Sequence, residues 1–177
     1  ISCNAYGQGQ TDPDFWQVGF QFGEGLGANN LVHTAIGCRA SGHKFNVRND
    51  NSQISWTGGL VQGGGVDFYH GGQGYMAVMG TRSEDSGRLF DSGGPAGFPQ
   101  HVTFDDVVWA ANEMTLDDIV ARCRSGGVYK FRNCRFYIAP TGRHPKFAGD
   151  GSGFQLIEID GVSATTAVGD LIASVSS

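Results

Sequence analysis

The sequence has 177 residues, of which 40% are hydrophobic and only 16% are charged, and its formal net charge is −5. This length suits one domain with a real core, and the low charge argues against a charge-driven disordered chain. The 29 glycines show no Gly-X-Y period, which excludes collagen, and no apolar run is long enough for a transmembrane helix. We therefore expect a single domain over residues 1–177 with no membrane span.

Short apolar segments separated by Gly, Asn and Ser fill the N-terminal half. In the first, over residues 15–22, apolar residues recur at every second position, which predicts a strand. Shorter β-compatible segments follow at 31–36, 45–47, 54–56, 66–69 and 75–79. A spacing of about 8–12 residues is typical of an all-β sandwich, barrel or solenoid.

The middle of the chain differs in composition from the N-terminal half. Residues 83–100 are rich in Gly and Pro and are expected to form a long surface loop. Residues 103–108 and 115–120 then resemble each other, each opening on a Thr followed by acids where a helix dipole favours them. This pattern predicts short helices near 103–125. The competing interpretation places Val102, Phe104, Val107 and Trp109 on a strand of a β-helix.

A further strand is expected at 128–138, with an internal shift of its apolar residues. Tyr129 and Phe131 share one parity, whereas the apolar residues beyond Asn133 have the other. One irregular residue near Asn133 explains the shift, because an extra residue reverses which side chains face inward. Another strand at 154–159, a turn at 160–161 and a tail of spaced apolar residues close the chain.

Three segments share an apolar pair, a polar corner and another apolar residue, namely 103–109, 129–136 and 156–162. Within the second, Phe131-Arg132-Asn133-Cys134-Arg135-Phe136 resembles the strand-corner-strand of right-handed parallel β-helices, the architecture of pectate-lyase-like enzymes and phage tailspikes. The resemblance implies a parallel β-helix. An antiparallel β-sandwich of the viral jelly-roll kind, with a short helical insertion near 103–125, accommodates the strand at 16–22 and the acid-led segment, and it is our predicted fold.

Basic residues are concentrated in one segment that contains no acid. Its members are Arg122, Arg124, Lys130, Arg132, Arg135, Arg143 and Lys146. With aromatic residues interleaved, this composition is typical of a contact with an acidic partner or nucleic acid. The favoured alternative is that the acids at 105, 106, 117 and 118, or those of another subunit, neutralise the segment.

Several aromatic residues lie close to glycine-rich turns and are candidates for stacking on a sugar ring. They are Trp16, Trp56, Tyr69 and Tyr75. Aromatic side chains of this kind are equally suited to the core of a β-domain, where most of them would be buried. Their exposure decides between the two roles.

The four cysteines allow two kinds of prediction. Spacing suggests the disulfides Cys3–Cys38 and Cys123–Cys134, and four buried thiols are the equally weighted alternative. We expect no metal and no other cofactor, because no Cys-x-x-Cys pair occurs and the histidines lack ligand spacing. No residue is assigned a catalytic role, and an enzyme is the less favoured class.

The composition and the all-β pattern favour a structural or attachment protein of a virion or another extracellular assembly, acting by self-association and surface recognition. A homo-oligomer is the expected state. A glycan-binding module and a β-helical polysaccharide-cleaving enzyme are the alternatives, which would need exposed aromatic residues and paired carboxylates respectively.

Overall fold

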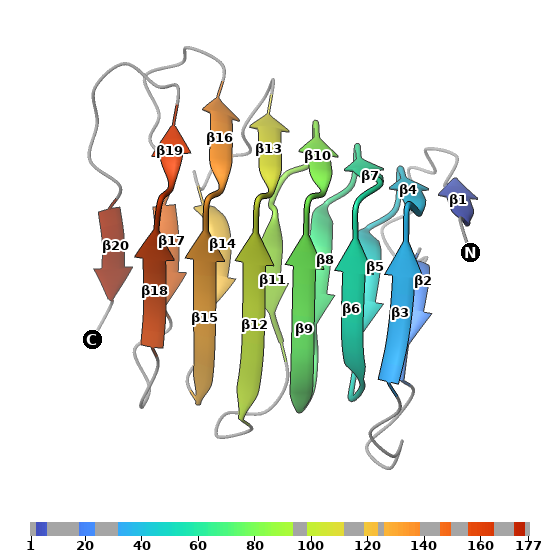
Figure 1. The fold of residues 1–177 in the computed structure, drawn as a ribbon, viewed down its shortest axis with the longest axis horizontal. Helices are drawn as coiled ribbons and strands as arrows, with labels where there is room; N and C mark the ends of the chain where they lie inside the picture. The colour runs from blue at the N-terminus through green and yellow to red at the C-terminus, as the bar shows by residue number, and fades with distance from the viewer. Residues whose placement is uncertain are drawn as a thin grey trace.

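The protein is a parallel β-solenoid, seen in a computed structural model that describes residues 3–6, 18–23, 32–93, 99–111, 119–123, 126–138, 146–149, 156–164 and 172–175. Every regular element in these residues is a strand. The strands form three parallel sheets, and within each sheet they lie side by side along the length of the molecule (Figure 1). Sheet A contains β1 (Asn4–Tyr6), β4 (Arg39–Ser41), β7 (Leu60–Gln62), β10 (Arg82–Glu84), β13 (Val108–Ala111), β16 (Arg135–Ile138) and β19 (Ser163–Ala164). Sheet B contains β2 (Val18–Phe22), β5 (Phe45–Asn49), β8 (Val66–His70), β11 (Phe90–Ser92), β14 (Ile119–Cys123), β17 (Lys146–Gly149) and β20 (Ile172–Val175). Sheet C contains β3 (Val32–Ile36), β6 (Gln53–Thr57), β9 (Gly74–Met79), β12 (Gln100–Asp105), β15 (Gly127–Arg132) and β18 (Leu156–Asp160).

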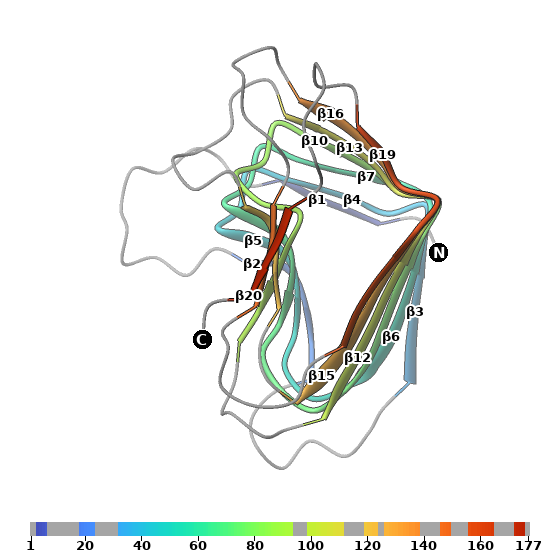
Figure 2. The same cartoon turned by 90° about the vertical axis from the view of Figure 1, so that its left-hand side faces the viewer.

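The chain visits the three sheets in turn, so that each coil contributes one strand to every sheet. Seen along the stack, the sheets form three walls around a common interior (Figure 2). Each strand pairs with the equivalent strand of the coils before and after it, always in parallel. The predicted antiparallel sandwich is therefore wrong, and the β-helix alternative is confirmed.

One corner residue between sheets C and A has the same conformation in every coil. It follows the last residue of each sheet C strand, and its φ lies between 51° and 66°. The six residues are Gly37, Gly58, Gly80, Asp106, Asn133 and Gly161. Glycine adopts this left-handed conformation without penalty, and Asp and Asn tolerate it better than other residues.

The corner residue explains the parity shift at Asn133. Before it, inward side chains alternate as Tyr129 and Phe131; after it, Cys134 and Phe136 face inward, and all four are buried. The backbone N–H of Asn133 donates to the carbonyl of Asp160 at 2.9 Å, and its side-chain amide donates to Asp105 Oδ1 at 3.0 Å. The corner therefore connects three coils.

The expected helices at 103–125 are also wrong where the structure describes them. Residues 100–105, 108–111 and 119–123 are strands, and residues 112–118 lie outside the described part. The acidic pair that suggested a helix start instead ends β12 and occupies the left-handed corner at Asp106. The strand interpretation of Val102, Phe104, Val107 and Trp109 is correct, since all four side chains are buried.

Aromatic rings run through the interior from coil to coil. Phe104 and Phe131, at equivalent positions of β12 and β15, stack in parallel planes with ring centroids 5.2 Å apart. Phe68 contacts Phe104 edge-on at 5.7 Å, and Phe147 contacts Phe131 at 4.7 Å. Such contacts add about 0.5–1.5 kcal/mol per pair to the effect of burial, so they hold each coil against its neighbours.

Asn133 offers a test of the corner. We expect Asn133→Val to lower the free energy of unfolding by about 1–2 kcal/mol, because a β-branched residue is strained at positive φ and the bond to Asp105 is lost. Loss of hydrogen-exchange protection should extend into β12 and β18, since each coil is held by its neighbours. Asn133→Gly, the matched control, keeps the conformation and should retain most of the stability. Equal stabilities for the two variants in urea unfolding would contradict the corner's role.

Candidate functional site

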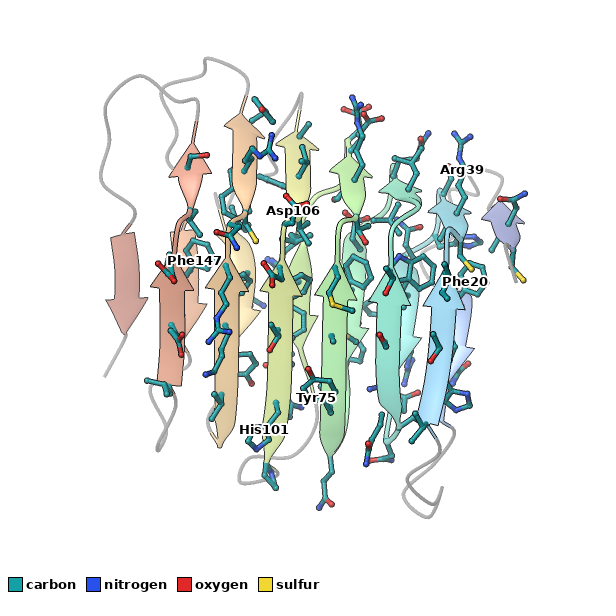
Figure 3. The ribbon with its side chains drawn as sticks, viewed as in Figure 1. Phe20, Arg39, Tyr75, His101, Asp106 and Phe147 are labelled. Atoms are coloured by element: carbon teal, nitrogen blue, oxygen red, sulfur yellow. The ribbon has the colours of Figure 1, made fainter. Side chains whose placement is uncertain are left out.

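A shallow pocket of about 480 Å³ opens on the outer face of sheet C, where the strands begin. It is lined by Gln53, Gln73, Gly74, Tyr75, Pro99 and His101. Tyr75 and His101 occupy paired positions on β9 and β12, and both are labelled on the near face in Figure 3. The Tyr75 residue is 44% exposed, so its ring is accessible to a ligand. The pocket therefore combines an accessible aromatic ring with side-chain amides and an imidazole.

Hydrogen bonds hold the backbone around the pocket. The N–H of Gln73 donates to Asn51 Oδ1 at 3.1 Å, and the N–H of Gly74 donates to the carbonyl of Pro99 at 3.4 Å. Gly72 lies beneath, where an added Cβ would come within 1.7 Å of the Asp50 carbonyl oxygen. Only glycine permits this approach, so the turn that carries Gln73 is tightly constrained.

The predicted stacking residues differ in exposure. Trp56 faces inward from β6 and is wholly buried, with its ring against that of Phe68. It therefore cannot stack on a ligand at the surface. Tyr69 is half-buried on sheet B, with its ring 4.6 Å from that of Phe45 and the Arg48 guanidinium 5.5 Å from its centroid. Trp16 lies outside the described residues. Tyr75 is thus the candidate in the described part that lines a pocket.

Two described acids have clearly shifted pKa values, and neither lies in the described lining of the pocket. On the outer face of sheet C, hydrogen bonds from Lys130 and Arg132 lower the pKa of Glu158, which favours the ionised form and makes it a poor proton donor. Burial raises the pKa of Asp67 to about 6, but that carboxylate is fully buried and out of a substrate's reach.

Three cations of the basic segment have acidic partners within the chain. Lys130 Nζ and Arg132 Nη2 each lie 2.9 Å from a Glu158 oxygen, and Arg135 Nη2 lies 3.4 Å from Asp106 Oδ1. Sequence analysis anticipated Asp106 as a partner and missed Glu158, which the next coil brings alongside. Three aromatic residues interleaved with these cations, Tyr129, Phe131 and Phe136, are buried and unavailable to nucleic-acid bases.

Of the other four members of the basic segment, the structure describes the side chain of one. Arg122 is half-buried on sheet B, next to Asp91 of β11 in the strand pairing. Arg124, Arg143 and the side chain of Lys146 lie outside what the structure describes, as do Asp117 and Asp118.

A cluster of polar side chains fills the interior near the turn from sheet A to sheet B. Asp67 accepts hydrogen bonds from Asn46 Nδ2 at 2.7 Å, from Ser86 Oγ at 2.6 Å and from the Ser83 hydroxyl. All four residues are buried. Desolvation is the largest influence on the carboxylate and outweighs these three donors, which is why its pKa rises.

None of the four cysteines, all of which are described, forms a disulfide; Cys3 is exposed and the other three are buried as thiols. Cys134 lies directly after the corner residue Asn133, and burial raises its pKa to about 11. At neutral pH this thiol is therefore protonated and a poor nucleophile.

The described residues contain no group of His, Cys, Asp or Glu side chains that could hold a metal ion. Nor does this part of the chain include a helix of the length and hydrophobicity needed to cross a membrane. Comparison with protein-family models, with curated proteins and with solved structures finds no match to this chain.

The pairing at Glu158 yields a test of the basic segment. Glu158→Gln removes the shared carboxylate, and we expect stronger retention on a heparin column because Lys130 and Arg132 lose their counter-charge. The free energy of unfolding should change little, because water screens exposed ion pairs. Glu84→Gln, which removes the partner of Arg82 on sheet A, is the control. Unchanged retention of the Glu158 variant would show that Glu158 does not mask these cations.

Asp67 provides a pH test of the interior. Its pKa is about 6 in the folded protein and 3.8 for an unperturbed aspartate, so the folded state holds the proton more tightly. The contribution to stability is therefore complete below about pH 4 and is lost as the pH rises to about 6, a change of roughly 3 kcal/mol. Asp67→Asn should flatten this part of the curve in urea unfolding. A wild-type protein whose stability increases steadily from pH 4 to 6 would contradict the raised pKa.

Proposed function

We propose that this protein is a carbohydrate-binding attachment module that uses the pocket around Tyr75 on sheet C. The observation that carries the proposal is the half-exposed Tyr75 ring beside the Gln53 and Gln73 amides and the His101 imidazole. An aromatic face covers the C–H surface of a sugar ring, while amide and imidazole groups donate to and accept from its hydroxyls. These lining groups suit a neutral glycan, because the described lining of the pocket contains no carboxylate and no guanidinium group.

A rigid scaffold supports this role. Gln53, Tyr75 and His101 occupy one column across β6, β9 and β12, so the strand register fixes their spacing. Residues on paired strands are held more precisely than residues on loops, which lowers the entropic cost of ordering them around a ligand. An open hollow on a flat sheet also suits a chain of sugars better than a small enclosed metabolite.

The wider expectation of a structural or attachment protein in a virion or another extracellular assembly is compatible with this binding role. A polysaccharide-cleaving enzyme is less favoured, because the described lining of the pocket contains no carboxylate pair. Nucleic acid is likewise less favoured, since Glu158 and Asp106 pair with three cations of the basic segment, Lys130, Arg132 and Arg135.

Replacement of Tyr75 tests the proposal. We expect Tyr75→Ala to reduce binding to the best ligand of a neutral-glycan array by about tenfold or more, since stacking of an aromatic ring is lost. The matched control is Tyr137→Ala on sheet A, because Tyr137 is 42% exposed against 44% for Tyr75 and lies outside the pocket.

Binding is measured by array fluorescence and then by calorimetry, with circular dichroism confirming that both variants are folded. Equal loss in the two variants, or no glycan bound by the wild-type protein, would overturn the proposal. His101→Ala and Gln53→Ala should each weaken binding less than Tyr75→Ala, because each removes hydrogen bonds rather than the ring.

A further inference from the structure

Exposed hydrophobic side chains gather on the outer face of sheet C. Among the described residues six large hydrophobic side chains are exposed, and five of them lie on this face, namely Val32, Ile36, Tyr75, Met79 and Leu156. Tyr75 and Met79 belong to β9, which pairs with β6 on one side and with β12 on the other. Their exposure therefore belongs to a lateral face of the coil stack and does not arise at one of its ends. Exposed apolar side chains that gather on one face mark an interaction surface.

The same face lacks charge along three neighbouring strands. The outward residues of β3, β6 and β9 are all described and uncharged, namely Val32, Thr34, Ile36, Gln53, Ser55, Thr57, Tyr75, Ala77 and Met79. The next strand ends in Asp105, whose carboxylate accepts a hydrogen bond from Asn133. Strands of the other two sheets carry outward charges, such as Arg48 on β5 and the Arg82–Glu84 pair on β10. The face of β3, β6 and β9 therefore suits a partner without charge, because no ion would have to lose its water there.

Tyr75 and Met79 mark two parallel columns on this face. Strand pairing aligns Tyr75 with Gln53 and His101, and it aligns Met79 with Thr57 on β6. At about 3.3 Å per residue, the four steps from Tyr75 to Met79 separate the columns by about 13 Å. Figure 2 shows the strands of sheet C as nearly straight ribbons in one wall. A single sugar chain along the Tyr75 column would leave Met79 uncovered, so a partner that contacts both columns must be broad and flat.

We propose that this face of sheet C adsorbs to the surface of a packed neutral polysaccharide, in which several sugar chains lie side by side. The inference rests on the proposed function, because the Tyr75 pocket belongs to the same face, and it adds the Met79 column as a second line of contact. The surface of such a polysaccharide presents C–H groups and hydroxyls without charge. Ser55 and Thr57 supply hydroxyls beside the exposed Tyr75 and Met79 side chains, so the face offers both kinds of contact.

The backbone that carries the second column is fixed by hydrogen bonds. The carbonyl of Met79 accepts from the N–H of Gly58 at 2.8 Å and from the Thr81 hydroxyl at 3.2 Å. Between the two columns Ala77 is only 6% exposed, so the larger side chains of Tyr75 and Met79 project beyond it. Contact groups held at a fixed spacing lose little freedom on binding to an ordered surface.

The experiment measures depletion of the protein from solution by microcrystalline cellulose and by chitin particles, two packed neutral polysaccharides. We expect the wild-type protein to adsorb to at least one of them. Met79→Lys should lower the partition constant by about fivefold or more, because an ammonium group would lose water against an uncharged surface. It should leave the binding of short soluble glycans on the array unchanged, since Met79 does not line the pocket. Thr57→Lys is a second variant in the same column and should act in the same way.

The matched control is Tyr137→Lys on sheet A, because Tyr137 is 42% exposed against 39% for Met79. It should change neither readout, and Tyr75→Ala should weaken both. Circular dichroism verifies that each variant is folded.

The outcomes separate this inference from the proposed function. A wild-type protein that binds array glycans and adsorbs to neither particle overturns the inference alone, whereas a protein that binds no glycan in either form overturns both. Equal losses of adsorption in Met79→Lys and Tyr137→Lys would also overturn the inference. So would sedimentation velocity showing self-association that Met79→Lys abolishes, because a second copy would then cover the face.

Discussion

The left-handed residue that follows every sheet C strand is the constraint on which the rest of this structure depends. It turns the chain from sheet C toward sheet A, whose strand begins two residues later, and resets which side chains face the interior. In the first five corners its own N–H, and in all six corners the N–H two residues later, donates to a carbonyl of a neighbouring coil. A β-branched residue at any of these positions would oppose both the turn and the register. Because the corner fixes the register, equivalent side chains of sheet C line up from coil to coil, both inside, as for Phe104 and Phe131, and outside, as for Tyr75 and His101.

Much of the strand content could be predicted from the sequence, whereas the direction of pairing could not. The described residues of the segments expected at 31–36, 45–47, 54–56, 66–69 and 75–79 are strands, and the irregularity at Asn133 is a corner. Alternation with a period of two describes one strand with one buried face, and it is the same in parallel and antiparallel sheets. The choice of a sandwich rested on the period-two run at 16–22 and on the acid-led segment, whose acids at 105–106 instead form the left-handed corner.

The shortest strands were also beyond a pattern-based prediction. β10 of sheet A and β11 of sheet B have three residues each, too few to show a period, and they lie partly or wholly in the segment expected to be a loop. What could have revealed them is the spacing between coils: equivalent positions such as Val32, Gln53 and Tyr75 recur at intervals close to the length of one coil. Repeats of this kind are best sought by aligning corners, because glycine, Asp and Asn mark them.

The candidate site illustrates the same limit. Tyr75 was a candidate from its sequence environment, but Trp56 fitted the same description and is buried, because exposure depends on which face of a sheet a residue occupies. Gln53, Gln73 and His101 were missed altogether, since stacking of coils brings together residues 20 or more positions apart. Glu158 was missed as the partner of Lys130 for the same reason. In a solenoid, proximity follows the coil period rather than local sequence.

The acids of this protein show how the same fold separates structural from surface chemistry. Asp67 is enclosed by the coils and accepts hydrogen bonds from three donors. Burial nevertheless raises its pKa, so loss of its proton lowers the stability of the fold. Glu158 lies on the outer face and is held ionised by two cations from the preceding coil. Neither carboxylate belongs to the described lining of the pocket.

The shape of the pocket also sets how strongly one copy could hold the proposed ligand. A single shallow hollow with one aromatic ring would bind a neutral sugar weakly, because few groups compensate the loss of ligand freedom. Strand register holds Gln53, Tyr75 and His101 in one column, so the protein itself would lose little freedom on binding. A glycan of several sugars that followed this column across β6, β9 and β12 would meet all three side chains at once, and its affinity should therefore exceed that of a single sugar.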